Sequence, residues 1–260
     1  MLSYIYPHER DQRICFQDEG HLYTIDGKTD YTSTTTFIKK FFPEFDADAI
    51  IQKMKISGSF DKKYAGKTAE QVKQEWKASG RQASEKGTKL HLFIENYFNG
   101  ETQDAIPQGI TQEVEYFYDF LKKVKPTAHR TEWYIFDEKY KIAGSIDFVC
   151  QLPSGELVIY DWKCSKEIKH FNRFEKGKYP VQDMDNCNGN YYALQLNVYK
   201  YILEEYYGKR VAEMNLIVLH HNNEGFISIP VPDLRHKVKA MLETLKKERV
   251  GSGIPLHRVG

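Results

Sequence analysis

Two carboxylates and a lysine lie in two neighbouring segments that both have the pattern of a strand. Asp147 ends the run AGSID, while Asp161 and Lys163 belong to the run LVIYDWKCS. Alternate residues of a strand share one face, so Asp161 and Lys163 point to the same side. Because Asp161 follows the apolar run LVIY, we expect it at a strand end near the core. These three side chains are therefore candidates for one chemical site.

The connection between the two strands sets how far apart the carboxylates lie. If residues 153–155 form a hairpin loop, Leu152 opposes Glu156, and the same register sets Asp147 opposite Asp161. Cross-strand Cβ atoms are about 4.5–5.5 Å apart, and like charges at that distance repel. A divalent cation would relieve the repulsion, and oxygen ligands favour Mg²⁺ or Mn²⁺ over Zn²⁺. The alternative is a cluster of surface ion pairs on an exposed strand face.

Two helical segments supply further polar candidates. His91 and Glu95 are four residues apart in GTKLHLFIE, so both point to one side of a helix, where His91 would complete a metal site. Taken alone, His91 also fits an ordinary packed or surface histidine. Gln195 and Tyr199 are likewise four apart in ALQLNVYKYI, and in isolation they form a polar stripe flanked by core residues.

Hydrophobic periodicity and turn residues predict the elements that carry these side chains. Residues 14–33 have the pattern of a hairpin with a turn at Asp26-Gly27, and Ser33 to Thr36 form a cap before a helix. Helices are also predicted at 68–80, 84–98, 113–124, 190–207 and 233–249, and strands at 131–137, 140–152, 156–165, 214–221 and 226–231. The pattern favours one α+β domain in which helices flank a central mixed, mostly antiparallel sheet.

The composition of the 260 residues limits the class of protein. It is 41% hydrophobic and 28% charged, which favours a folded globular chain. No stretch approaches the roughly 20 apolar residues of a membrane span, and the N-terminus lacks the pattern of a signal or organellar targeting peptide. Four cysteines without a C-x-x-C pair favour a reducing compartment. The net charge of +1 alone argues against a polyanionic partner.

Five motifs follow one another between residues 87 and 199: GTKLHLFIE, Glu132, AGSID, LVIYDWKCS and QLNVY. In this combination the chain resembles the PD-(D/E)xK nuclease superfamily, specifically its RecB-like branch, which includes mitochondrial genome-maintenance exonucleases and CRISPR-associated RecB-type nucleases. The run YTSTTTFI is similar to the Ser-x-Thr element of many RecB-like proteins. The resemblance implies a restriction-endonuclease-like α/β/α core in a single nuclease domain of residues 1–260. Within it we expect a DNA-binding flank at 1–83, the nuclease core at 84–232, and a C-terminal helix and tail at 233–260.

The resemblance implies a metal site that holds one or two Mg²⁺ or Mn²⁺ ions. Two glutamates, Glu95 and Glu132, are candidates for an outer ligand or water contact, or equally for structural pairs with a lysine. The residues that the resemblance implies as metal ligands are His91, Asp147, Asp161 and, through its backbone carbonyl, Trp162.

The resemblance also implies catalytic roles for three further residues. Lys163 would position or activate the attacking water, as a base or as an electrostatic clamp, and Gln195 and Tyr199 would orient the site and the nucleic acid. The chain departs from the RecB-like pattern twice: Ser145-Ile146 stand where a proline usually precedes the first acidic residue, and the second acidic residue is Asp rather than Glu. Neither departure removes a catalytic group.

Several RecB-like relatives hold an iron–sulfur cluster through one upstream and three downstream cysteines. Here no cysteine follows Cys187, and Cys150 and Cys164 fall on the strand faces opposite the carboxylates. We therefore expect no cluster, and interpret these cysteines as small hydrophobic residues.

Basic and aromatic residues alternate directly after the strand that carries Lys163. Cations meet phosphates and rings stack on bases, so this segment is typical of single-strand binding, although a solvated lysine-rich loop has the same composition. Ser33 and Thr35 at the capped helix start could hold a phosphate or serve only as a cap. The basic residues are Lys166, Lys169, Arg173, Lys176 and Lys178, and the aromatic ones are Phe171, Phe174 and Tyr179.

Together these features predict a Mg²⁺-dependent DNA exonuclease that hydrolyses phosphodiester bonds at ends or on single strands. The alternatives are a structure-specific endonuclease with the same site, a catalytically silent nucleic-acid-binding protein of the same fold, and a metal-dependent phosphoesterase that is not a nuclease. We expect DNA as the partner, a separate helicase or recombination protein for any unwinding, and no membrane. The expected location is intracellular, in the cytoplasm, the nucleoid or a viral or host replication compartment.

Overall fold

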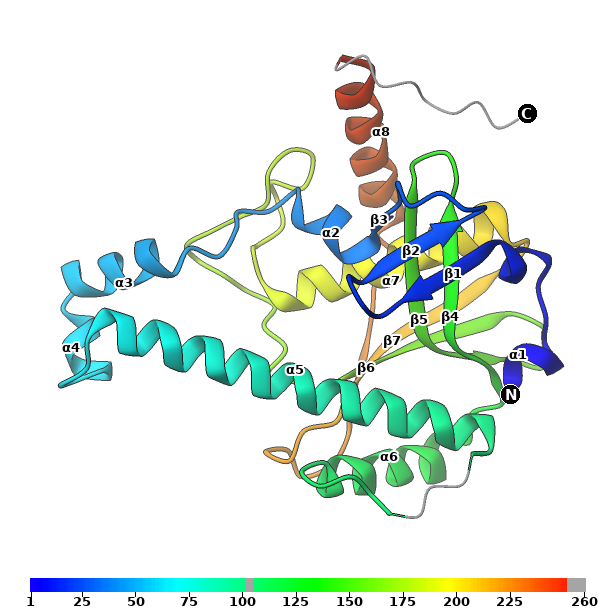
Figure 1. Cartoon of the computed structure of the whole chain (residues 1–260), viewed down its shortest axis with the longest axis horizontal. Coiled ribbons are helices and arrows are strands. Elements are labelled where there is room, and N and C mark those ends of the chain that lie inside the picture. The colour runs from blue at the N-terminus through cyan, green and yellow to red at the C-terminus, as the bar shows by residue number, and fades with distance from the viewer. Residues whose placement is uncertain (102–104, 252–260) are drawn as a thin grey trace.

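A mixed sheet forms the centre of the molecule, with helices on both faces (Figure 1). The computed structural model describes residues 1–101 and 105–251, and the expected tail at 252–260 lies outside them. In the described part, the strands of this sheet lie in the order β3, β5, β6, β7, β8, with β4 paired to β5. Their bounds are β3 Thr32–Ser33, β4 Ala128–Asp137, β5 Ile142–Gln151, β6 Leu157–Lys163, β7 Val211–Val218 and β8 Ile227–Pro230. Three of the five pairings are antiparallel, which confirms the predicted mixed, mostly antiparallel sheet.

The helices cover the sheet from two sides. Phe37, Leu194 and Val238 of α2, α7 and α8 belong to the core on one face, and Leu90 and Phe117 of α5 and α6 to the core on the other. In the described chain none of the helices is long and apolar enough to cross a membrane. The bounds are α1 Leu2–Ile5, a 3₁₀ turn Glu9–Arg13, α2 Thr34–Lys39, α3 Ala47–Ile56, α4 Ser59–Lys63, α5 Ala69–Asn99, α6 Thr111–Val124, α7 Asn188–Tyr206 and α8 Arg235–Gly251.

The central strand β5 has different partners along its two edges. On one edge it pairs with β4 along its length. On the other edge it pairs with β3 only at Ile142 and Ala143, and with β6 only from Phe148 onward. In the described residues, 144–147 have no strand partner on that edge. The sheet therefore opens at the AGSID motif.

Helix α5 is longer than the sequence pattern predicts. The predicted stop at Gly80 is wrong, because one helix runs through Ala69–Asn99 and so also crosses the expected boundary at 83/84. A glycine inside a helix costs only about 1 kcal/mol, which packing of the helix can offset. The predicted capping box is confirmed: Thr68 Oγ1 accepts the N–H of Gln71, and the Gln71 side chain accepts the N–H of Thr68.

The N-terminal hairpin turns at a different place from the one predicted. β1 (Ile14–Gln17) and β2 (Leu22–Ile25) are joined through residues 18–21, not through Asp26-Gly27. Asp26 and Gly27, both with positive φ, instead form the next turn after β2. The turn chemistry was thus recognised, but the apolar pattern did not show which of two turns joins the strands.

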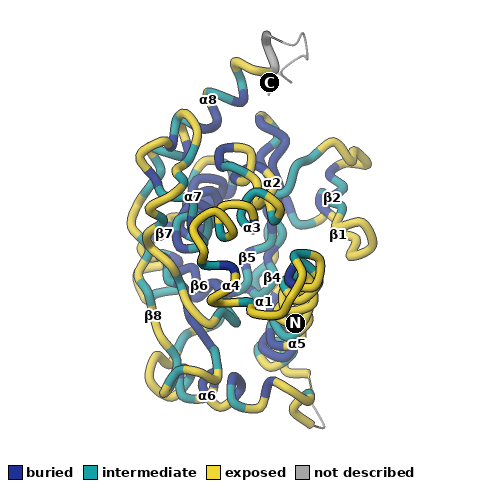
Figure 2. Tube along the Cα trace, turned by 90° about the vertical axis from the view of Figure 1, so that its left-hand side faces the viewer, coloured by how far each residue is buried: buried dark blue, intermediate teal, exposed yellow. Residues whose placement is uncertain are grey.

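An arm made of α3, α4 and the start of α5 extends from the body (Figure 1). Its buried core is small and consists of Ile51, Phe60 and Val72. Most of α3 and α4 is exposed (Figure 2). This arm reaches toward residues 164–187, the loop between β6 and α7.

Candidate active site

The opening in the sheet brings Asp147 and Asp161 to one place. β5 and β6 pair Phe148 with Tyr160, and the same register continued by one residue opposes Asp147 and Asp161, as predicted. The predicted loop is also present, since the N–H of Leu152 donates to the carbonyl of Glu156. Where the ladder ends, the backbone N–H of Trp162 donates to Asp147 Oδ2 at 2.9 Å. The carboxylate of Asp147 thus replaces a strand partner.

Glu132 adds a third carboxylate to the same row. β4 pairs Thr131 with Phe148 and Trp133 with Ile146, so Glu132 stands level with Asp147. Ser145 Oγ donates to Glu132 Oε2 at 2.6 Å and fixes the side chain. Glu132 has a φ of 41°, a left-handed value that costs of order 1–3 kcal/mol for a residue other than glycine. That backbone strain within a strand supports a functional reason for its position.

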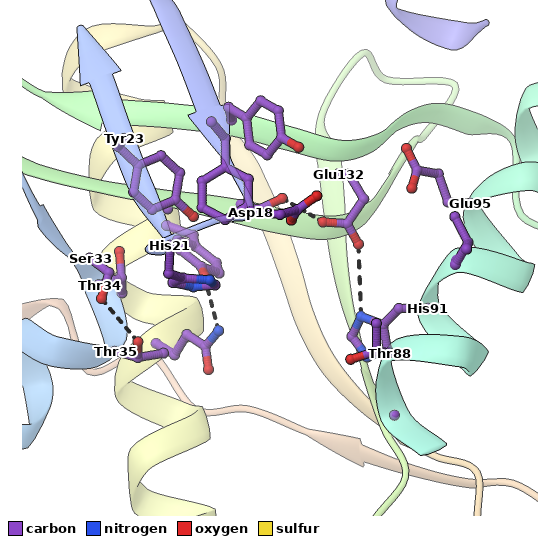
Figure 3. Close-up of a pocket in the computed structure, with 18 residues that line it drawn as sticks. Asp18, His21, Tyr23, Ser33, Thr34, Thr35, Thr88, His91, Glu95 and Glu132 are labelled. Atoms are coloured by element: carbon purple, nitrogen blue, oxygen red, sulfur yellow. Dashed lines mark hydrogen bonds and ion pairs between the residues drawn. The ribbon is translucent and has the colours of Figure 1, made fainter. Parts of the chain in front are cut away.

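His91 faces this row from α5 (Figure 3). Its Nε2 lies 2.9 Å from the carbonyl oxygen of Trp162, which can only accept, so Nε2 carries the hydrogen. Nδ1 then points at Glu132 Oε1 and Asp147 Oδ2, each 3.7 Å away. Burial alone would lower the pKa of His91, but the carboxylates of Asp147 and Glu132 outweigh it and raise the pKa to about 9.

Asp161 and Lys163 form an ion pair at the floor of the site. Asp161 is 1% exposed, and Lys163 Nζ contacts its Oδ2. Burial raises the pKa of Asp161; the Lys163 ammonium opposes this shift and Asp147 adds to it. Burial would lower the pKa of Lys163, but the two aspartates raise it above its usual value. The lysine is therefore an ammonium, 4.6 Å from the ring centroid of Tyr192.

The donor set fits a hard divalent cation. One ligand atom each from His91, Glu132 and Asp147 lies within 4.8 Å of the other two. Asp161 Oδ1 is buried and, among the described residues, receives no hydrogen bond; Lys163 pairs with Oδ2, so a bound cation would stabilise the oxygen that is left without a partner. Carboxylate oxygens with one imidazole nitrogen suit Mg²⁺ or Mn²⁺. Glu132, expected only as an outer ligand, lies inside the cluster, whereas Asp161 pairs with Lys163 at its edge.

His91 and Glu132 line a cavity of about 580 Å³, the carboxylate cavity, whereas Asp147, Asp161 and Lys163 are not among its lining residues (Figure 3). Gln195 and Tyr199 project into it from α7, with Gln195 Nε2 donating to Tyr199 Oη at 2.9 Å. A Cβ atom at Gly144 would lie 2.6 Å from Tyr199 Cε1 and 2.8 Å from Thr34 Oγ1. The glycine of the AGSID motif therefore admits the tyrosine of the QLNVY motif.

The structure separates the remaining predicted residues. Ser33, Thr35 and Glu95 line the carboxylate cavity, and Ser33 Oγ caps α2 by accepting the N–H of Thr36. Lys169 and Arg173 line a different cavity, and Lys176 Nζ lies 3.9 Å from Asp185. Lys166 and Lys178 are exposed. Of the cysteines, Cys150 and Cys187 are buried and Cys164 is partly buried, and all are free thiols; the expectation of no iron–sulfur cluster stays a prediction.

Several lining residues were not predicted as parts of a site. The β1–β2 hairpin and the strand β4 contribute them, and no local motif marks a hairpin as the wall of a distant cavity. The position of Glu132 could have been predicted from the register of β4 and β5. Pairing Asp137 with Ile142 around the turn after β4 sets Glu132 level with Asp147. Outside the five motifs, the lining residues without a predicted role are Phe16, Asp18, His21, Tyr23, Tyr134 and, from α2, Thr34.

Comparison with known proteins agrees with this geometry at the level of the family. The solved structures that are similar include a candidate exonuclease from Eubacterium rectale (14% identity, TM-score 0.47, 87% of this chain and 83% of that one) and the protein SSO0001 (10% identity, TM-score 0.36, 86% and 77%). No curated protein matches the sequence. The family model of the PD-(D/E)XK nuclease superfamily matches residues 56–252. The chain therefore belongs to the PD-(D/E)XK nuclease superfamily.

Proposed function

We propose that this nuclease is a metal-dependent DNA exonuclease of the RecB-like branch that acts at ends or on single strands. The observation that carries the proposal is the row of Glu132, Asp147 and Asp161 across three neighbouring strands, with His91 above it and Lys163 beside it. The order of the five motifs supports the RecB-like branch.

Each residue of the site has a role in this proposal. A divalent cation, when bound, supplies Lewis-acid activation of the phosphodiester and of water. His91, Glu132 and Asp147 would hold it together with Asp161, and the carbonyl of Trp162 keeps the His91 ring oriented through Nε2. The Lys163 ammonium offers positive charge to the charge that develops on the phosphate oxygens, which favours the clamp role over the base role.

Gln195 and Tyr199 act as positioning residues. Tyr199 is buried, and burial holds its pKa far above the usual value, so the phenol keeps its proton. The hydroxyl accepts from Gln195 and its ring packs over Gly144, which fixes the wall opposite His91. This wall would hold the sugar-phosphate backbone against the carboxylate row.

End-labelled DNA tests the proposal directly. Linear single strands, linear duplexes and closed circles are incubated with Mg²⁺, with Mn²⁺ or with EDTA, and the products are resolved by length. We expect hydrolysis of linear strands with either metal, none with EDTA, and only slow cutting of circles. Rapid cutting of circles would replace the exonuclease with an endonuclease, and hydrolysis in EDTA would contradict the metal site. Single-stranded RNA of the same sequence reports the preference for DNA.

A further inference from the structure

Three cavities adjoin one another along the wall formed by α2 and α7. The carboxylate cavity shares Thr35 and Gln195 with an intermediate cavity of about 370 Å³. The intermediate cavity shares Lys39, Asn188 and Tyr191 with a distal cavity of about 1060 Å³. The distal cavity lies between α3 and the loop of residues 164–187. A continuous groove thus leads away from the active site.

The distal cavity has exposed aromatic rings in its walls. Phe45 is 73% exposed, Phe171 69% and Phe174 76%. Phe45 meets Trp76 of α5 edge-on, with ring centroids 5.9 Å apart, and the Arg173 guanidinium lies 4.6 Å from the centroid of Phe174. Three phenylalanines gathered on one open cavity form an apolar surface that folding alone does not require.

The loop holds these rings outward with its own polar residues. Asn172 Nδ2 donates to the carbonyl of Asn186, and the backbone N–H of Asn172 donates to Asp185 Oδ2. Asn186 Nδ2 donates across the cavity wall to the carbonyl of Pro43 and to Glu175 Oε2. The loop therefore turns its amides inward and its phenylalanines to solvent, the reverse of the usual arrangement of a surface loop. The rings are preorganised for a ligand.

The charges of the distal cavity favour an anionic ligand. Among the described residues its four cations make no ion pair. Its three acids keep their charge, although Asp46 accepts the N–H of Ala49 as the cap of α3 and Glu175 accepts from Asn186, so the four cations exceed the carboxylates by one. The cations are Lys39, Lys53, Lys169 and Arg173.

We propose that the groove binds single-stranded DNA, with the sugar-phosphate backbone passing along α2 and α7 and unpaired bases stacking on Phe45, Phe171 and Phe174 in the distal cavity. The inference rests on the proposed function. Stacking needs the face of a base, which a duplex covers with the neighbouring base pair, so the rings select single strands. The groove thereby gives the enzyme a second contact with its substrate, away from the bond that is cut.

Binding without divalent ions tests the groove separately from hydrolysis. Fluorescence anisotropy with a labelled oligothymidylate of about 16 nucleotides, the upper range for one single-strand binding domain, gives Kd in EDTA. We expect Phe171→Ala and Phe174→Ala each to weaken binding roughly 5- to 100-fold, the equivalent of one lost stacking contact. Phe171→Tyr should keep the affinity and Phe171→Leu should lose it, because only a ring stacks. Tyr4→Ala, at an aromatic residue 82% exposed outside the groove, is the matched control.

The length of the strand gives the second readout. A labelled dinucleotide is too short to reach the distal cavity from the active site, so the phenylalanine variants should hydrolyse it as wild type does. On the long strand they should raise KM at unchanged kcat. The proposal is overturned if wild type does not bind the long strand, or if the alanine variants bind it as tightly as wild type does. It is also overturned if the alanine substitutions weaken the binding of a duplex hairpin as much as that of the single strand. Ring-dependent binding without any hydrolysis would retain the groove and reject the proposed nuclease activity.

Discussion

The two ends of the groove carry opposite charge. The distal cavity presents four unpaired cations and three exposed rings. On the other side, an acidic cavity of about 240 Å³ shares Glu95, Glu132 and Tyr134 with the carboxylate cavity. It adds Glu101 and Asp11.

The one basic side chain among the described residues of the acidic cavity does not offset its charge. Arg130 is buried, and its Nη1 donates to Asp11 Oδ2 at 2.7 Å and to the carbonyl of Tyr6 at 3.0 Å. Among the described residues Glu95 and Glu101 therefore remain without an ion-pair partner, and Glu132 pairs only with His91, 3.7 Å away. A polyanion is attracted to one side of the carboxylate row and repelled on the other, so we expect the strand to end near the row, as an exonuclease requires.

We expect the largest effect from a substitution of Asp161, which should lower kcat without changing the binding of DNA in the distal cavity. Asp161→Asn keeps the volume but removes the negative charge that faces Lys163, so we expect kcat to fall at least about 100-fold, since even residues that only orient metal ligands cost 10- to 100-fold. Affinity for single-stranded DNA in EDTA should stay within about 2-fold of wild type, because the distal cavity is unchanged. Asp119→Asn, at a half-buried aspartate on α6 that pairs with Lys122, is the control, and a thermal melt checks folding. Activity equal to wild type would remove Asp161 from the site.

A buried histidine makes the acidic end sensitive to pH. His129 is 5% exposed and its ring centroid lies 4.5 Å from that of Tyr6, in the N-terminal segment that walls the acidic cavity. Burial, with help from Lys209 and Arg130, lowers the pKa of His129 from 6.5 to about 4. Between these values the unfolded chain binds a proton that the folded chain excludes. The free energy of unfolding should therefore fall by up to about 3 kcal/mol as the pH drops from 6.5 to 4.

Urea unfolding at several pH values measures this effect. His129→Gln cannot titrate, so its free energy of unfolding should change less between pH 6.5 and 4 than that of wild type. His236→Gln, at an exposed position on α8, controls for the loss of a histidine. A slope in His129→Gln as steep as in wild type would assign the acid sensitivity to other groups.

The junction between the two ends depends on one glycine. In Gly144→Ala the new methyl group meets Tyr199 and Thr34 at under 3 Å, so the wall of the carboxylate cavity must move. We expect a loss of about 1–3 kcal/mol in stability and a lower kcat, because overpacking displaces Tyr199. Gly80→Ala is the matched control: a Cβ there meets nothing within 4 Å, and inside α5 it should stabilise by up to about 1 kcal/mol. Equal melting temperatures for the two variants would contradict the close packing at Gly144.

Much of the carboxylate row could be predicted from the sequence because its determinants are local. The hairpin between Leu152 and Glu156 is short, so the register that opposes Asp147 and Asp161 follows from counting residues. The same holds for the capping box at Thr68 and for the four-residue spacing of Gln195 and Tyr199.

The groove could not be predicted because it depends on contacts between distant segments. The cavity that contains Phe45 and Phe171 exists only because α5 is one continuous helix with α3 packed on its start, whereas the pattern predicted a break at Gly80. The composition of the aromatic loop predicts a binding segment, but its position depends on the Asn186 side chain, which joins it to Pro43. The hydrophobic periodicity of a sequence cannot predict a hydrogen bond between residues so far apart.

The smallest expected effect comes from reversing one charge at the acidic end. Glu101→Lys places a cation in the acidic cavity, so a strand that continues past the carboxylate row meets less repulsion. We expect the slow cutting of circular single strands to rise about 2- to 5-fold at low salt, with the gain lost at high salt, since exposed charges are screened. Glu205→Lys, exposed on α7 and outside the cavities described above, changes the net charge equally and should leave the slow cutting of circles as in wild type. If both variants cut circles equally well, net charge would explain the gain. If wild type cuts circles as fast as linear strands, the acidic cavity does not stop a strand from continuing past the carboxylate row. The difference in charge between the distal and acidic cavities would then have no part in the selection of DNA ends.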